Sequence, residues 1–304
     1  MKYAIAVDFG GTKIKGCIVD DEARIIKSMK TLTEADNGKK QVLQNISRVV
    51  SQLESGFTKP ISGIGISMPG FADKTGKVLF AGNLLSGLVG VNLKKELKKV
   101  SALPVFIEND ANCFALAEAI HGAGKNHGIV IGIIWGSGLG SGIVIDRKIY
   151  SGSIGGAGET GHILIRPDIK SSKFGAGHPG SLEMLVSGKN IERMYREKGG
   201  KMENPTAEAI YASKEKITKQ IFDSAIDNLG IGLSTIVNIV NPDIIVMGGG
   251  VSNLSDDVYK KLRTAVRKYA LPTHTKKLKI SRYKISDDAG VLGAAGLVFQ
   301  QTRQ

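Results

Sequence analysis

The sequence predicts an α/β protein of two duplicated lobes, each with the order βββαβα, and a cleft between them. The first observation is a repeat. Residues 7–20, VDFGGTKIKGCIVD, and residues 133–146, IIWGSGLGSGIVID, both read as a strand, a glycine turn and a second strand. After each copy, strands alternate with amphipathic helices, which is typical of sheets with parallel strands. With 304 residues, 42% of them hydrophobic, the chain is long enough for two hydrophobic cores.

The first lobe is predicted from runs of apolar residues separated by polar turns. Its predicted strands lie at residues 3–8, 14–20, 23–31, 61–68 and 104–110. Its predicted helices lie at residues 39–53, directly after Asn92, and at 111–124. The first of these helices is indicated by Leu43, Ile46, Val50 and Leu53, which recur at helical spacing. Because helices connect the later strands, we expect parallel strands whose carboxyl ends meet at one edge of the sheet.

The second lobe repeats this alternation with a longer helical region. Its predicted strands lie at residues 128–138, 140–146, 243–250 and 278–285. Asn204 and Pro205 are predicted to open a helix, a long helix covers 214–240, another starts at Ser255, and Asp287 with Asp288 opens the last one. We expect this last helix to cross back to the first lobe. The predicted lobes are 1–117 plus 290–304, and 118–289.

Composition favours a soluble cytoplasmic protein. The net charge is +13, but the lysines fall in groups that suit the solvent-facing sides of helices, so neither a nucleic-acid nor a membrane partner is expected. The two cysteines, Cys17 and Cys113, lie in apolar runs and read as core residues in a reducing compartment. The chain starts directly with a strand, so neither a secretory signal nor an N-terminal DNA-binding segment is expected.

Three glycine clusters are candidates for contacts with a nucleotide. In the first turn, Gly10 and Gly11 let backbone N–H groups approach phosphate oxygens, Thr12 adds a hydroxyl and Lys13 adds a charge. The candidates of the second turn and of the third cluster are Gly136, Ser137, Gly138, Gly248 and Gly249. A strand follows each of the first two turns, which excludes the P-loop and the dinucleotide fingerprint. The alternatives are ordinary hairpins and a tight strand exit.

One position distinguishes the two copies of the repeat. Asp8 in the first copy corresponds to Ile134 in the second, so only the first turn carries a carboxylate. A second carboxylate, Asp110, follows Asn109 at the predicted end of strand 104–110. There it can accept a proton from a substrate hydroxyl, while Asn109 can both donate to a sugar and accept from it. The alternative is that Asp110 is the N-cap of the next helix.

Several strings in fixed order resemble the ROK family of repressors, open-reading-frame proteins and sugar kinases. They are DFGGTK, Glu108–Asp110 (END), the second glycine turn, Glu159–His162 (ExGH), GSLE and MGGG. The resemblance extends over residues 3–297 and implies the actin-like ATPase fold, which is ribonuclease H-like and shared with hexokinase. It also implies that Asp8 holds Mg²⁺ directly or through a water, and that Asp110 is the general base. The glycine turns would bind ATP phosphates, with Gly248 and Gly249 along the adenosine. The implied sugar-binding residues are Asn83, Asn109, Asp110, Glu159, His162 and Glu183.

The sequence departs from the family where many relatives bind zinc. Their string C-x-C-G-x-x-G-C-x-E supplies three cysteines that join the ExGH histidine. The string here is FGAGHPGSLE, in which Phe174, Ala176 and Ser181 occupy the cysteine positions. We therefore predict no structural zinc, with Mg²⁺ and ATP as the only cofactors. His162 is then free to bind sugar, and the alternative is a structural histidine.

The resemblance implies ATP-dependent phosphorylation of a hexose hydroxyl by a glucokinase-like enzyme. The expected acceptor is the 6-OH of glucose, of a related hexose or of an N-acetylhexosamine, and polyphosphate stays open as the donor. The alternatives are a sugar-responsive transcriptional regulator and a non-catalytic sugar-binding protein. The first is disfavoured because no DNA-binding segment precedes the first strand. We expect a homodimer or a higher homo-oligomer.

Overall fold

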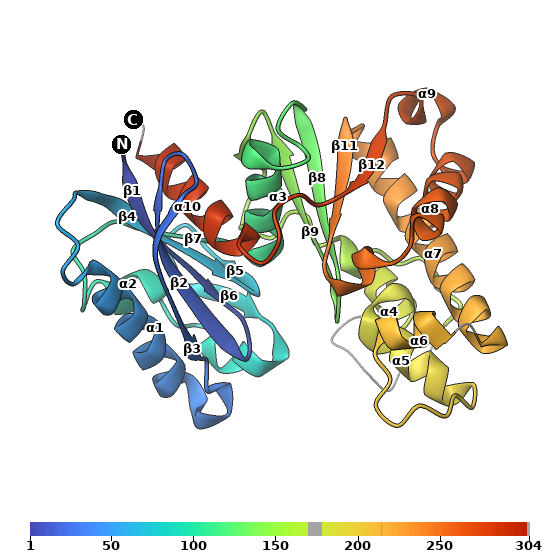
Figure 1. Ribbon diagram of the computed structural model, residues 1–304, viewed down its shortest axis with the longest axis horizontal. Helices are drawn as coiled ribbons and strands as arrows, with labels where there is room; N and C mark the ends of the chain where they lie inside the picture. Colours follow the sequence, from blue (N-terminus) through green and yellow to red (C-terminus); the bar gives the residue numbers. More distant parts are fainter. Residues whose placement is uncertain (170–177, 214, 303–304) are drawn as a thin grey trace. The chain divides into compact units, whose positions relative to one another are not determined.

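The computed structural model describes residues 1–169, 178–213 and 215–302, and the chain forms two compact units (Figure 1). The first unit comprises Met1–Lys125, Arg147–Ala157 and Lys284–Gln304, and the second comprises Asn126–Asp146 and Gly158–Tyr283. These limits differ from the predicted lobes mainly at residues 147–157, which count with the first unit. The predicted limits themselves, and the cleft, stay predictions.

The first unit contains a sheet with the strand order β3-β2-β1-β4-β7. Its strands are β1 (Tyr3–Phe9), β2 (Lys13–Asp20), β3 (Ile25–Leu32), β4 (Ile61–Met68) and β7 (Val105–Asn109). β1, β2 and β3 are antiparallel neighbours, whereas β1, β4 and β7 are parallel. The carboxyl ends of these three parallel strands therefore lie at one edge of the sheet, as predicted.

Helices cover both faces of this sheet because its strands are apolar on both sides. On β1, Ile5 and Val7 pack with α1 (Gly38–Glu54) and α2 (Leu93–Leu97), while Ala4 and Ala6 pack with α10 (Ala289–Gln301). Figure 1 shows α10, in red, beside the blue strand β1, and α3 (Asp110–His121) packs against α10. The C-terminal helix thus crosses back to the first unit, as predicted from its position in the sequence.

The second unit repeats the pattern of the first in the consecutive strands β9-β8-β11-β12 of the sheet β10-β9-β8-β11-β12. Its strands are β8 (Ile129–Trp135), β9 (Leu139–Ile145), β11 (Ile244–Gly248) and β12 (Lys279–Arg282). β8 and β9 form an antiparallel hairpin, as β1 and β2 do, and β8, β11 and β12 are parallel, as β1, β4 and β7 are. The repeated sequence therefore corresponds to a repeated strand arrangement.

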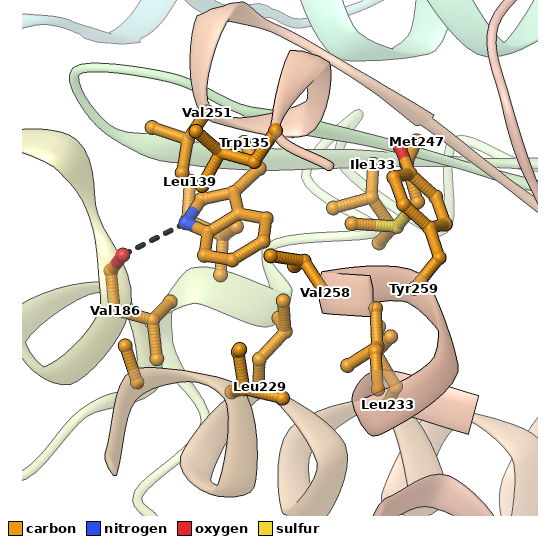
Figure 2. Close-up of a cluster of buried hydrophobic side chains, with 14 of the residues drawn as sticks. Ile133, Trp135, Leu139, Val186, Leu229, Leu233, Met247, Val251, Val258 and Tyr259 are labelled. Carbon is orange, nitrogen blue, oxygen red and sulfur yellow. Dashed lines mark hydrogen bonds between the residues drawn. The ribbon is translucent and has the colours of Figure 1, made fainter. Parts of the chain in front are cut away.

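The core of the second unit lies between this sheet and its helices. The helices are α4 (Leu182–Val186), α5 (Gly188–Glu197), α6 (Ala207–Ser213), α7 (Lys216–Val240), α8 (Asp256–Tyr269) and α9 (Pro272–Thr275). Figure 2 shows Trp135 among Leu229, Val258 and other apolar side chains from α7, α8 and the sheet. Trp135 is 1% exposed, and its indole N–H donates to the carbonyl of Val186 at 2.8 Å. The largest side chain of this core thus also satisfies its polar atom.

The remaining elements are short. They are β5 (Gly70–Ala72), β6 (Val78–Ala81), β10 (Lys148–Ile149), and the 3₁₀ helices at Ala35–Asn37, Asn83–Leu88, Thr160–His162 and Gly250–Asn253. Throughout the described ranges of the chain, no helix is both long and apolar enough to span a bilayer.

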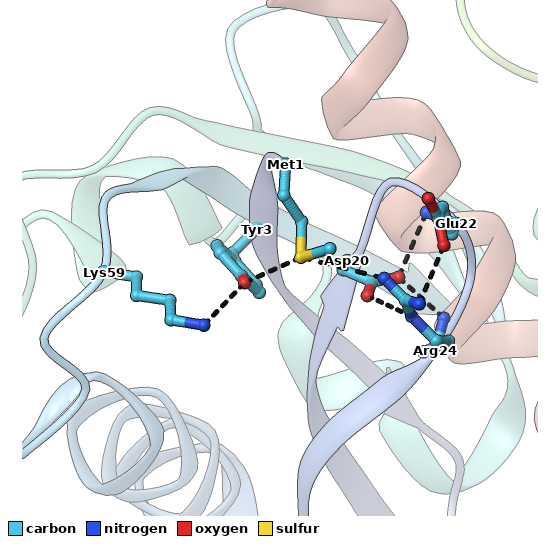
Figure 3. Close-up of polar contacts among 6 residues, drawn as sticks. All are labelled: Met1, Tyr3, Asp20, Glu22, Arg24 and Lys59. Carbon is cyan, nitrogen blue, oxygen red and sulfur yellow. Dashed lines mark hydrogen bonds and ion pairs between the residues drawn. The ribbon is translucent and has the colours of Figure 1, made fainter.

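The turn after β2 contains a buried charge with a full set of hydrogen-bond donors (Figure 3). Asp20 has no exposed surface and accepts hydrogen bonds from the backbone N–H of Glu22 and of Arg24, and from the Arg24 side chain at 2.7 Å. Burial alone would raise the pKa of Asp20, but these hydrogen bonds outweigh it and lower the pKa. Nearby, Lys59 donates to the hydroxyl of Tyr3. The hairpin of β2 and β3 is thereby closed by the ion pair between Asp20 and Arg24.

One predicted helix cap is wrong, and a second lies at the predicted position without a side-chain hydrogen bond. α6 begins at Ala207, and the hydroxyl of Thr206, not Asn204, accepts the N–H of Ala209 at 3.1 Å. α10 begins directly after Asp288, as predicted, but the Asp288 side chain makes no cap hydrogen bond and instead forms an ion pair with Lys15. A distant cation attracts this carboxylate more strongly than the local N–H groups do, and residue order along the chain does not reveal such a partner.

Both cysteines are buried free thiols, and Cys17 leads to a testable pH dependence. Burial raises the pKa of the Cys17 thiol from 9.0 to about 11. Between these values the unfolded chain has lost the proton while the folded chain retains it, so stability falls as the pH rises. From pH 8 to pH 10, the wild type should lose about 1 kcal/mol more unfolding free energy than Cys17→Ala. Urea unfolding at both pH values measures this difference, and equal losses would contradict the assignment.

Candidate active site

In the first unit, Asp8 lies near the carboxyl end of β1, beside the ends of its neighbours. The hydroxyl of Ser67, on β4, donates to the Asp8 carboxylate at 2.6 Å. Lys15, on β2, is paired with Asp8 in the antiparallel ladder. A Cβ atom on Gly290 would lie 2.5 Å from the Asp8 carboxyl carbon, so the start of α10 approaches Asp8 as only glycine permits. Burial raises the pKa of Asp8, against the hydrogen bond from Ser67 and the charge of Lys15. A cation bound nearby would stabilise the ionised form of this buried carboxylate.

The first glycine turn is fixed by a residue that sequence reasoning missed. Thr33 is fully buried, donates its hydroxyl to the carbonyl of Gly10 at 2.7 Å and its backbone N–H to the carbonyl of Thr12 at 2.9 Å. Thr12 and Lys13 themselves are exposed. The carbonyls of Gly10 and Thr12 therefore accept hydrogen bonds from the protein itself. The hydroxyl of Thr12 and the ammonium group of Lys13 are exposed, where a ligand can contact them. A threonine just after a strand carries no sequence signal for this role.

At the carboxyl end of β7, Asn109 and Asp110 have different structural roles. Asn109 is the N-cap of α3: its side-chain oxygen accepts the N–H groups of Ala111 at 2.9 Å and Asn112 at 3.2 Å. Its amide nitrogen donates to the carbonyl of Gly70 at 3.1 Å. Asp110 is the first residue of α3, and its carboxylate also accepts the N–H of Ala111 at 2.8 Å. The positive end of the helix dipole favours a carboxylate there.

In the second unit, the second glycine turn is attached to the start of α5. The N–H of Gly188 donates to the carbonyl of Gly136 at 2.8 Å, and the N–H of Lys189 donates to the carbonyl of Ser137 at 3.3 Å. Ser137 and Gly138 are exposed. As in the first unit, the carbonyls of the turn are engaged by the protein. Its exposed side is then available to phosphate oxygens.

The third glycine cluster lies against the second turn. Gly249 has φ +85°, and a Cβ atom on it would lie 2.5 Å from the carbonyl oxygen of Trp135. A Cβ atom on Gly136 would lie 3.9 Å from the backbone nitrogen of Gly250. Gly248 is buried at the end of β11. The predicted phosphate turn and the predicted adenosine-side glycines are thus brought together, although 112 positions separate Gly136 from Gly248.

The ExGH and GSLE segments also meet in the second unit. The carboxylate of Glu159 lies 3.9 Å from the Nε2 atom of His162, and Glu183 accepts the N–H of Leu139 at 2.8 Å. Burial raises the pKa of Glu159, with His162 acting against this and Glu183 in its favour. Since Leu139 directly follows the second glycine turn, Glu183 connects this acidic cluster with that turn.

Two further hydroxyl residues position the ExGH segment. Ser141, on β9, donates to the carbonyl of Gly158 and lies 2.6 Å from the hydroxyl of Thr160. Both hydroxyl residues are buried. Neither was predicted from the sequence, because an isolated serine in a strand is most often a structural residue.

The side chain of Asn83 lies outside the described part of the chain, and so do Phe174 and Ala176 of the zinc-site string. Within residues 1–169, 178–213 and 215–302, no three His, Cys, Asp or Glu side chains are grouped as a metal site would require. Mg²⁺ is commonly bound through one or two carboxylates together with substrate phosphates, so the single carboxylate of Asp8 fits this ion.

Comparison with known proteins decides the family. The family model described as "ROK family" matches residues 4–301, almost the whole chain. This chain belongs to the ROK family. The resemblance seen in the ordered motifs is therefore confirmed.

Relatives within this family cover the full length of the chain. The glucokinase of Thermotoga maritima is 31% identical, over 97% of this chain and 96% of its own. The N-acetyl-D-glucosamine kinase of Pectobacterium carotovorum is also 31% identical, over 95% and 96%. The crystal structure of a ROK family glucokinase from Streptomyces griseus, in complex with glucose and AMPPNP, is 29% identical with a TM-score of 0.81, over 98% of this chain and 99% of that one. The predicted actin-like ATPase fold is confirmed.

Proposed function

We propose that this ROK protein is a sugar kinase that transfers the γ-phosphoryl group of ATP to a hydroxyl of a hexose. The acceptor is the 6-OH of glucose, of a close epimer or of an N-acetylhexosamine. The observation that carries the proposal is the placement of Asp110. It is the first residue of α3, while the capping role is taken by Asn109. Family membership and relatives named as glucokinase and N-acetyl-D-glucosamine kinase support the same reaction.

In the proposed reaction, Asp110 is the general base. Its carboxylate accepts the proton of the sugar hydroxyl, whose oxygen forms a bond to the γ-phosphorus as the bond to the β,γ-bridging oxygen breaks. The products are a sugar phosphate, ADP and one proton, which leaves Asp110 for solvent. The dipole of α3 stabilises the carboxylate before proton transfer. A positioned base of this kind contributes typically ~10²–10⁴-fold to the rate.

Mg²⁺, when bound with ATP, would neutralise charge on the transferred phosphoryl group. Asp8 would hold this ion directly or through a water, and the hydroxyl of Ser67 orients the carboxylate. The exposed Thr12, Lys13 and Ser137 would contact phosphate oxygens, together with the backbone of the two glycine turns. Gly249, where a side chain would collide with Trp135, suits the close approach of the adenosine.

The proposed sugar-binding residues are Glu159, His162, Glu183 and Asn109, with Asn83 as a further candidate. The hydrogen bonds that Asn109 already makes limit those that it can make to a sugar. Both acceptor positions of its side-chain oxygen are used in capping α3, and one of its two amide hydrogens is donated to Gly70. It can therefore donate one hydrogen bond to a sugar oxygen and accept none. The carboxylates of Glu159 and Glu183 would accept from sugar hydroxyls.

A panel of acceptors and donors tests the proposal. Release of ADP should depend on one or a few members of a set containing glucose, mannose, N-acetylglucosamine and N-acetylmannosamine, with Mg²⁺ present. Polyphosphate in place of ATP tests the donor. Binding of a sugar without turnover under any donor would favour the regulator or the non-catalytic binding protein. No sugar-dependent turnover across the panel would refute the kinase.

A further inference from the structure

We propose that Glu108 is a positioning residue that holds the start of α3, and with it Asp110, in place, and that Ser151 fixes the Glu108 carboxylate in turn. This inference rests on the proposed kinase function and adds a residue to it. Glu108 is the first residue of the END string and is 9% exposed, on β7. None of the catalytic or binding roles proposed above is assigned to Glu108. Its importance lies in what its two oxygen atoms accept.

One carboxylate oxygen of Glu108 fixes the start of α3. It accepts the backbone N–H of Asn109 at 2.9 Å and the side-chain amide of Asn112 at 2.9 Å. Asn109 in turn caps α3, whose first residue is Asp110. The proposed base is thus two residues from Glu108, at the start of a helix whose first turn this oxygen contacts through Asn112.

The other carboxylate oxygen accepts the hydroxyl of Ser151 at 2.9 Å, although 43 positions separate these residues. Ser151 belongs to the segment 147–157, which forms part of the first unit. The carbonyl of Ser151 accepts the N–H of Ala157 at 3.1 Å. This bond closes the segment into a loop, so that fixing Ser151 also fixes Ala157, the last residue of the segment. Glu159, the first residue of ExGH, follows two positions later.

Within the first unit, a continuous set of contacts therefore leads from the start of α3, where the proposed base lies, through Glu108 and Ser151 to Ala157. Hydrogen bonds to a buried charge are among the stronger ones in proteins. Phosphoryl transfer depends on the alignment of the acceptor hydroxyl with its base, and a displacement of about 1 Å can cost ~10²-fold in rate. The bond between Glu108 and Ser151 would hold Asp110 in the position that this alignment requires.

The test uses the full chain with the sugar that the wild type phosphorylates best. Ser151→Ala should lower kcat/KM for the sugar about tenfold, as expected for the loss of one hydrogen bond to a charged group, with the KM for ATP unchanged. Ser151→Thr, which retains the hydroxyl, should regain at least half of the wild-type value. Ser153→Ala is the matched control, since Ser153 is an exposed serine in the same segment. Thermal unfolding checks that each variant is folded.

A double-mutant cycle identifies Glu108 as the partner. In a Glu108→Ala background, Ser151→Ala should cause less than a twofold further loss, because the contact is already absent. The inference is overturned if Ser151→Ala behaves like Ser153→Ala, if it raises the KM for ATP as much as that for the sugar, or if the two substitutions are additive. These outcomes require an active wild type, so they are distinct from a failure of the kinase proposal, in which the wild type shows no sugar-dependent turnover.

Discussion

Asp110→Asn should lower kcat by ~10²–10⁴-fold while leaving the affinity for sugar and nucleotide within a few-fold of the wild type. An amide has the shape of the carboxylate but cannot accept the proton of the sugar hydroxyl. The fold should be retained because the cap of α3 is Asn109 and because the side-chain oxygen of an asparagine at position 110 can still accept the N–H of Ala111, as the Asp110 carboxylate does. Steady-state kinetics gives kcat, and calorimetric titration with sugar and with a non-hydrolysable ATP analogue gives the affinities.

A matched control for this prediction is Asp21→Asn, which removes an exposed carboxylate from the same unit. It should retain wild-type kcat and the same thermal midpoint. Loss of an N-cap costs typically ~1 kcal/mol, which would lower the thermal midpoint measurably. If Asp110→Asn lowered stability by that amount and kcat only slightly, the carboxylate would be structural and the assignment of the base would be wrong.

Trp135→Ala should lower the free energy of unfolding by ~3–5 kcal/mol. Trp135 is the largest fully buried side chain of the protein among the residues described, and it packs between the second sheet and α7 and α8 (Figure 2). Its removal leaves a cavity and deprives the carbonyl of Val186 of its 2.8 Å donor. Circular dichroism in a guanidinium titration measures the loss, since the chain contains no other tryptophan to follow by fluorescence.

Trp135→Phe separates the two contributions. Phenylalanine fills most of the volume but cannot donate to Val186, so this variant should lose less than half as much as Trp135→Ala. Equal losses in the two variants would mean that the hydrogen bond, and not the packing, dominates. A loss below about 1 kcal/mol for Trp135→Ala would show that the core adjusts around the missing ring.

Much of the fold followed from local patterns. The predicted helix 39–53 corresponds to α1 (Gly38–Glu54), and the predicted strand 61–68 corresponds to β4 (Ile61–Met68). Periodicity succeeds in these cases because burial of one helix face, or of whole strands, selects residues at regular spacing. The cap predicted at Asn204 was wrong because Thr206, a similar short polar residue two positions later, accepts the helix N–H. Asp288 lies at the N-cap of α10 as predicted, but its side chain binds the distant Lys15 and not a local N–H group.

The candidate site was predicted less completely than the fold. The motifs named the glycine turns, Asp8, Asp110 and the ExGH residues, whose catalytic and binding roles are still to be tested by experiment. They did not reveal Thr33, which orders the first turn, or Ser67, which contacts Asp8. Serine and threonine are common in strands and loops, so their positions in the sequence alone carry little information about function.

The sequence by itself determined the repeat, the order of strands and helices, and the family. These depend on residue types at short spacing, because apolar periodicity and glycine turns act within a few residues of the chain. Only the tertiary structure decided that Asn109, rather than Asp110, caps α3, that Glu183 accepts the N–H of Leu139, and that Glu108 accepts the hydroxyl of Ser151. The latter two contacts span 44 and 43 positions. A hydrogen bond over such a separation exists only after packing has brought the two elements together.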